Sequence, residues 1–289
     1  MNALNDGGLN NQSTTLPINS EQATTYIIER TKQLVNKAIE IRGNDKPPFL
    51  PNEYAKLKGI KSIVKADLGK TSGLLLRFHD GPVIKVNQNQ NLARQNFSCA
   101  HEIGHILFSE LKLENYVSSI EHRTFNPQAK MKVRADARER LCDAAATELL
   151  MPENIFKKYL SQSVISIPFI EKLADIFKVS IQTAAWRIAE LSSEPCIAII
   201  WKLIPTTNII KLSWKVRPNI NNKKKVLYSP VHTKISSPSL LHKAFESNDC
   251  VKFYKDFKVG NTIKRILTEA KGYGRGENRY VVSLTFPER

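Results

Sequence analysis

The chain has 289 residues, of which 42% are hydrophobic and 24% charged, a composition typical of globular proteins that excludes wholesale disorder. At about 100–200 residues per domain, this length predicts two domains or three small ones. No apolar run approaches the roughly 20 residues of a membrane span, and residues 1–20 lack the pattern of a secretory signal. The four cysteines are far apart, which favours a reducing compartment. We therefore expect a cytoplasmic protein without a membrane partner.

Basic residues are concentrated in the last third of the chain. Lys and Arg number 43 against 27 Asp and Glu, a net charge of +16, and residues 195–289 hold 18 basic and 6 acidic residues. Such a domain attracts polyanions through its electric field and through counterion release. DNA or an acidic partner is one interpretation. The other interpretation is a basic surface that is simply solvated. Charge without a binding motif does not distinguish between the two interpretations.

The first half of the chain predicts an α+β unit. Residues 1–24 are polar and are expected to form a disordered tail. Periodicity and turn residues predict helices over 26–41, 52–58, 92–114 and 135–151. Strands are expected over 60–65, 73–79 and 82–87, the last two joined by the hairpin signal Asp80-Gly81. We assign residues 25–165 to one domain with a small antiparallel sheet and two long helices.

Two short helices follow over residues 166–194, joined at Lys178-Val179-Ser180 in a spacing that resembles a helix-turn-helix. The second helix carries Trp186 and a single basic residue, Arg187, which is poor for phosphate contacts. Packing against the preceding domain is therefore favoured over DNA reading, although both stay open.

After residue 194 the sequence pattern becomes typical of strands. They are expected over 196–203, 209–216, 225–228 and 280–286, with a helix around Thr262–Ala270. This pattern predicts a separate basic α+β domain over residues 195–289.

The sharpest motif is His101-Glu102-Ile103-Gly104-His105. On a helix, residues i and i+4 share a face, so both imidazoles can reach one ion. Zn²⁺ suits two neutral imidazoles and a carboxylate, with a fourth position for water. Glu102 is placed to take a proton from that water and deliver it to a leaving amine. Two histidines on an ordinary helix surface are the alternative, which the position after a hairpin makes less favourable.

A third ligand must come from elsewhere, because positions 108 and 111 lack the Gly and His of the metzincin pattern. The second long helix offers Glu139 and Asp143, one turn apart, and the small residues 144–146 allow the two helices to approach. Glu139 is then the candidate ligand, and Asp143 accepts the second N–H of a ligand histidine. The alternative is a solvent-facing acidic pair, with Asp143 bound to Arg140.

The segments SCAHEIGHILF (98–108) and ERLCDAAATELLMP (139–152) together resemble the ImmA/IrrE family of bacterial zinc metallopeptidases. The resemblance covers roughly residues 26–191 and includes LADIFKVSIQTAAWRI (173–188). In that pattern Glu139 matches the third-ligand glutamate and Asp143 the Asn/Asp position. The resemblance implies a zincin-like metallopeptidase core for residues 25–165. We expect one Zn²⁺ per chain, or Mn²⁺ in its place.

The resemblance also implies a function, and it implies a regulatory or sensor role for residues 195–289, where some members of the family carry an appended sensor-like domain. Members of this family are intracellular regulators, so the expected activity is cleavage of a helix-turn-helix transcriptional repressor, which frees its target genes in a stress response. The competing hypothesis is a regulator that binds metal or a partner without cutting. Tyr116 and His122, in the loop between the two motif helices, are equal candidates for stabilising the transition state.

Overall fold

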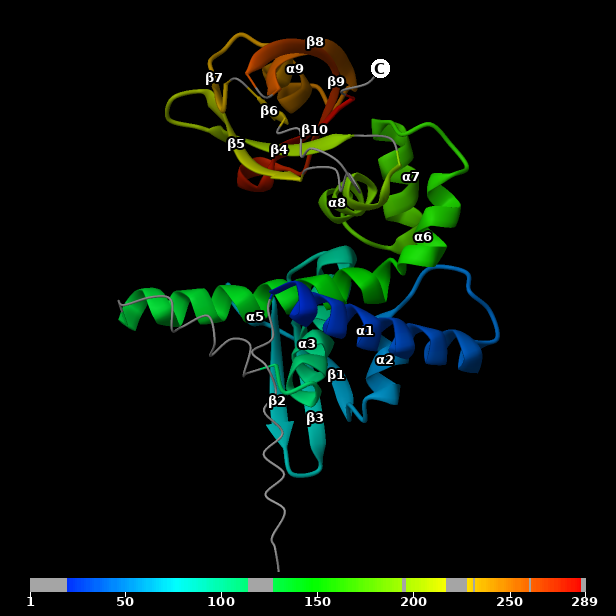
Figure 1. The fold of residues 1–289 in the computed structure, drawn as a ribbon. Helices are drawn as coiled ribbons and strands as arrows, with labels where there is room; N and C mark the ends of the chain where they lie inside the picture. Colours follow the sequence, from blue (N-terminus) through cyan, green and yellow to red (C-terminus); the bar gives the residue numbers. More distant parts are fainter. Residues whose placement is uncertain are drawn as a thin grey trace, which may run out of the picture.

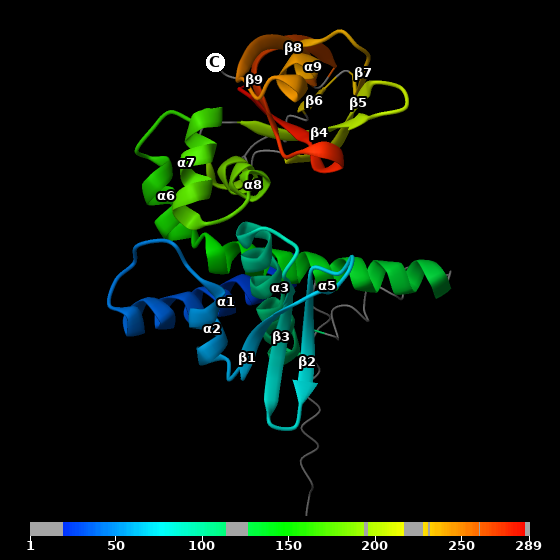
Figure 2. The same ribbon diagram turned by 180° about the vertical axis from the view of Figure 1, so that it is seen from behind.

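The computed structural model describes residues 20–113, 127–193, 196–216, 228–230, 232–259 and 261–286. It is a mixed α+β structure, as the sequence predicts. An N-terminal part holds the histidine motif, a seven-stranded sheet forms the other end, and short helices lie between them (Figure 1 and Figure 2). Most of the predicted tail, 1–24, lies outside the described residues.

The N-terminal part combines long helices with a three-stranded sheet. Its helices are α1 (Ser20–Arg42), α2 (Pro51–Leu57), α3 (Leu92–Glu110) and α5 (Pro127–Leu150). Its strands are β1 (Ser62–Ala66), β2 (Gly73–Phe78) and β3 (Gly81–Asn87), in the order β1-β3-β2.

The prediction of a purely antiparallel sheet was wrong, because β1 pairs with β3 in parallel while β2 and β3 form the antiparallel hairpin. The hairpin folds β3 into the centre of the sheet, where it runs in the same direction as β1. The buried amide of Asn87 fixes the intervening connection by donating to the carbonyl oxygens of Gly69 and Thr71 at 2.9 and 2.8 Å. Periodicity identifies strands but not the order in which they pair.

Helices α3 and α5 approach each other closely at Gly104. A Cβ at this position would lie 2.9 Å from the carbonyl oxygen of Cys142 and 3.0 Å from its Cα, so no side chain larger than hydrogen fits. Ala100, Ala145 and Ala146 are fully buried around this crossing. Small residues therefore set the distance between the two helices that carry the motifs.

Replacement of Gly104 by Ala tests this crossing. In an exposed helix the change stabilises by about 1 kcal/mol through propensity. Here we expect a loss of about 1–3 kcal/mol in the free energy of unfolding, because the methyl group forces α3 and α5 apart. Urea unfolding measures the effect, with Ser109→Ala near the end of the same helix as control. A gain in stability would contradict the close approach.

Three short helices connect the two ends of the molecule: α6 (Glu153–Leu160), α7 (Ile167–Phe177) and α8 (Ile181–Leu191). Ser180 caps α8 by accepting a hydrogen bond from the Thr183 N–H at 3.1 Å, as its position in the sequence predicts. Lys178 adopts the left-handed conformation that ends α7, with φ of 54°.

Arg187 of α8 is buried and ties this helix to the end of α5. Its guanidinium forms ion pairs with Glu148 and Glu190 and donates to the carbonyl oxygen of Met151 at 3.1 Å. Its side chain therefore cannot contact a phosphate group without leaving the core. This arrangement supports a packing role for the helix-turn-helix-like segment.

An Arg187→Met substitution should cost about 3–5 kcal/mol of unfolding free energy, because the Glu148 carboxylate then remains buried without its partner. Adding Glu148→Met to the same chain should recover most of the loss. Lys178→Met removes an exposed ion pair with Asp175 and serves as the matched control, with an expected change below about 1 kcal/mol. Equal small effects of both single substitutions in chemical denaturation would refute the assignment.

The C-terminal part is an antiparallel sheet with one helix of its own, α9 (Leu240–Glu246). The strand order is β6-β8-β9-β10-β4-β5-β7. The strands are β4 (Ile197–Ile204), β5 (Ile209–Val216), β6 (Tyr228–Pro230), β7 (Lys234–Ile235), β8 (Val251–Val259), β9 (Thr262–Tyr273) and β10 (Tyr280–Thr285). A short 3₁₀ turn, Gly276–Asn278, precedes β10.

The helix expected around Thr262–Ala270 was wrong, since this segment lies within β9. Its Lys, Arg, Leu, Glu and Ala residues favour a helix locally. Pairing with β8 along one side and β10 along the other overrides that preference. The sequence analysis also did not predict β8.

Both faces of the C-terminal sheet are covered. Ala198, Ile200, Val282 and Leu284 belong to the same apolar core as the N-terminal part, whereas alternate residues of β4 and β10 pack against α9. The carboxylate of Glu269 accepts a hydrogen bond from the buried N–H of Ile167 at 3.1 Å. The sheet thus rests on α7 and α8 (Figure 1). That residues 195–289 form a separately folding domain stays a prediction.

Candidate metal centre

Two histidines and one glutamate converge between α3 and α5. His101 and His105 lie one turn apart on α3, with ring centroids 4.8 Å apart. The carboxylate of Glu139, on α5, lies 2.9 Å from Nε2 of His101 and 3.7 Å from Nε2 of His105. The candidate ligand atoms of these three residues all lie within 4.8 Å of one another. The structure therefore brings together the three residues that the sequence proposed as ligands.

The opposite nitrogen of each imidazole has its own partner on α5. Nδ1 of His101 lies 2.8 Å from the Asp143 carboxylate, and Nε2 lies 2.9 Å from the Glu139 carboxylate. Without a metal ion the protonated imidazole can donate to both carboxylates, whereas a neutral imidazole with its proton on Nδ1 would present the Nε2 lone pair to a cation. Nδ1 of His105 lies 3.2 Å from Sγ of Cys142. Asp143 thus contacts His101, not Arg140 as in the solvent-facing alternative. The Cys142 contact was not predicted, although its place beside Asp143 on the same helix is a sequence signal.

The geometry fits a small divalent cation. Tetrahedral coordination with bonds of about 2.0–2.1 Å separates ligand atoms by about 3.3 Å. The two histidine–glutamate distances, 2.9 and 3.7 Å, lie on either side of this value. Two neutral imidazoles and a carboxylate form a donor set that zinc prefers. The cluster is therefore compatible with a metal ion held by these three side chains.

The pKa values of the two histidines are shifted in opposite directions. Burial and the neighbouring charge of His101 lower the pKa of His105 to about 4, so its imidazole is neutral at pH 7. Burial also opposes the charged form of His101, but the hydrogen bond and charges of Asp143 and Glu139 outweigh it and raise its pKa. Protons therefore compete with a cation mainly at His101.

Glu102 lies beside the cluster, against the edge strand of the small sheet. Its side chain is buried and lies against Gly73 on β2. Burial raises the pKa of Glu102, the nearby charge of His101 lowers it, and the charge of Glu139 raises it, with a net increase. A Cβ at Gly73 would lie 3.0 Å from Oε1 of Glu102, so a side chain at position 73 would crowd this carboxylate.

The two candidates for stabilising a transition state, Tyr116 and His122, lie outside the described residues. The structure neither supports nor contradicts a role for them. That prediction is unchanged.

Comparison with known proteins relates the N-terminal part to a family. Residues 58–189 match the IrrE N-terminal-like domain, which supports the resemblance to the ImmA/IrrE family that the two motifs indicated. The match covers all the residues of the candidate metal centre. The match to a peptidase family model suggests peptidase activity.

A solved structure shares the whole architecture. A Mycobacterium tuberculosis transcriptional regulator superposes with a TM-score of 0.57 at 18% identity, covering 94% of this chain and 82% of that chain. At this identity the similarity concerns the fold alone, and it extends beyond the family domain into the C-terminal sheet. No curated protein matches the sequence. Among the described helices, none is long and apolar enough to cross a membrane.

Proposed function

We propose that this protein is a zinc-dependent endopeptidase that cleaves a helix-turn-helix transcriptional repressor and thereby relieves repression of its target genes. The observation that carries the proposal is the convergence of His101, His105 and Glu139 beside the buried carboxylate of Glu102. A pure metal-binding regulator would not require an acidic residue at position 102. A catalytic function therefore explains both the three ligands and Glu102, whereas metal binding alone explains only the ligands.

His101, His105 and Glu139 would hold the ion, with Mn²⁺ as the alternative to Zn²⁺. The ion supplies the Lewis acidity that makes water nucleophilic at neutral pH. Glu102 takes a proton from the attacking water and delivers it to the leaving amine, a role favoured by its raised pKa. Asp143 keeps Nδ1 of His101 protonated, so that Nε2 carries the lone pair.

The edge of β2 offers a place for the substrate. In the sheet order β1-β3-β2, this strand is an outer one among the described residues, and its Gly73 lies against the Glu102 carboxylate. An extended peptide added to this edge would run past the carboxylate of Glu102. The site thus suits a segment of protein chain that can become extended.

The choice of a repressor as substrate has separate support. It rests on the ImmA/IrrE resemblance and on a structural neighbour that is itself named a transcriptional regulator. The basic C-terminal part would meet DNA or an acidic partner, such as a repressor bound to its operator.

Replacement of Asp143 by Asn tests the role of this residue behind His101. We expect the affinity for zinc to fall about 10- to 100-fold, because the ligand imidazole loses its charged acceptor. Chelator competition followed by metal analysis measures the affinity. Asp136→Asn, an exposed change on the same helix, should leave it unaltered. If both variants bind zinc like the original protein, Asp143 does not orient His101.

The test of the proposed function is Glu102→Gln. This variant should retain zinc but cleave a cognate helix-turn-helix repressor about 10²- to 10⁴-fold more slowly, because the base is lost while the ligands remain. Metal-loaded protein is incubated with the repressor, and a single cut is followed on a gel and by mass spectrometry. Glu110→Gln, at the end of the same helix, is the matched control. Undiminished cleavage by Glu102→Gln would exclude its role as base, and no cut with either protein would favour the non-catalytic regulator.

A further inference from the structure

A second site lies on the other side of α5. A cavity of about 680 Å³ opens between α1, α3, α5, α8 and the first strands of the C-terminal sheet. Figure 1 shows how α8 lies between α5 and β4. Its volume is within the range of about 300–1,000 Å³ typical of small-molecule sites, which often lie between domains. None of the three candidate metal ligands lines it.

The cavity follows one stripe of α5. Arg140, Asp143, Ala144 and Thr147 line it, a spacing of three and four residues that places them on a single helix face. Glu139 and Cys142 belong to the neighbouring face, toward α3. Helix α5 therefore serves the candidate metal centre and the cavity at once, and Asp143 contacts both.

The charge of the cavity is positive. Its acidic residues are already engaged, Asp143 with His101 and Glu190 with Arg187. Arg140 and Lys202, in contrast, form no ion pair with any of the described residues. Both are exposed to the cavity and to solvent, one on α5 and one on β4. An anion held between them would find cations that no protein carboxylate neutralises.

The remaining walls are apolar and aromatic. Ile28 and Phe97 come from the N-terminal helices and Ile200 from β4. Trp186 of α8, which the packing of Arg187 holds in place, also lines the cavity and is 42% exposed. A flat apolar group can therefore bind beside the two cations.

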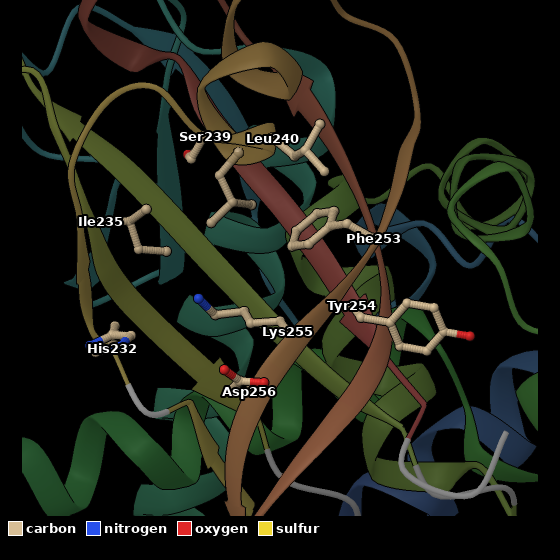
Figure 3. Close-up of a pocket in the computed structure, with 9 residues that line it drawn as sticks. His232, Ile235, Ser239, Leu240, Phe253, Tyr254, Lys255 and Asp256 are labelled. Carbon is tan, nitrogen blue, oxygen red and sulfur yellow. The ribbon is translucent and has the colours of Figure 1, made fainter.

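A smaller cavity within the C-terminal part is a weaker candidate. It has a volume of about 250 Å³ and is lined by Lys255, Asp256 and Phe253, among others (Figure 3). The ammonium of Lys255 lies 5.0 Å from the ring centroid of Trp201, so it already has a partner. This cavity lacks the combination of free cations and apolar walls.

We propose that the cavity between the two parts of the molecule binds a small organic anion that carries a flat apolar group, with Arg140 and Lys202 contacting the anion and Trp186 the flat group. A ligand placed there joins α5 to β4 and so links the C-terminal sheet to the helix that carries Glu139. The proposal rests on the geometry of this cavity and does not require peptidase activity.

The test uses 1-naphthyl phosphate as the probe, titrated calorimetrically into the full chain. We expect one site per chain, with weaker binding of both inorganic phosphate and 1-naphthol, because each lacks one half of the recognised chemistry. The double variant Arg140→Met/Lys202→Met should bind the probe at least about tenfold more weakly, by loss of both cations. Lys264→Met/Arg265→Met, the same change of charge on exposed positions of β9, should bind within about twofold of the original protein.

A Trp186→Leu variant separates recognition of the flat group from charge. It should weaken binding of 1-naphthyl phosphate and leave inorganic phosphate unaffected. Thermal unfolding verifies that each variant is folded. The proposal is overturned if the probe does not bind, if Arg140→Met/Lys202→Met binds it unchanged, or if both double variants weaken binding equally.

Discussion

The close approach of α3 and α5 is the constraint on which the rest of the N-terminal part depends. Gly104 lies between His101 and His105 and rests directly on the backbone of Cys142, so that two imidazoles on one helix come within reach of a carboxylate on the other. The contacts that orient the imidazoles, from Asp143 and Cys142, also cross this interface. A wider separation would break both sets of contacts at once. The glycine of the motif is thus as much a part of the site as its histidines.

A second interaction fixes the end of α5. Glu148 is buried next to the helix end and binds both Arg187 of α8 and the backbone N–H of Glu153 at the start of α6. Isolated buried charges are costly, and this pair is tolerated because both carboxylate oxygens of Glu148 accept a hydrogen bond and the Arg187 guanidinium donates to three acceptors. It holds α8 against the N-terminal part, and α8 in turn carries the C-terminal sheet. The same pair therefore helps to position α8, whose Trp186 lines the cavity.

The sequence predicted what local spacing determines. The i, i+4 histidines, the Glu139 and Asp143 pair and the Ser180 cap all depend on helix periodicity, and the structure places each of them as expected. Pairing between distant segments was predicted less well. Whether β1 joins β3 in parallel, or whether residues 262–270 become a strand, is decided by neighbours far along the chain. The cavity could not be predicted, because residues of α1, α3, α5, α8, β4 and β5, which are far apart in the sequence, form its walls.

Helix α5 contributes to the candidate metal centre with one face and to the cavity with another. Toward α3 the helix presents Glu139 and Cys142, and toward the cavity it presents Arg140 and Thr147, with Asp143 between them. A helix with partners on two sides has no single apolar stripe, and the mixed sequence ERLCDAAATELL is what such a helix requires. Asp143 cannot move toward a ligand in the cavity without changing its hydrogen bond to His101. Any free energy that couples the two sites must act equally on both, so occupancy of one would alter affinity at the other by the same factor.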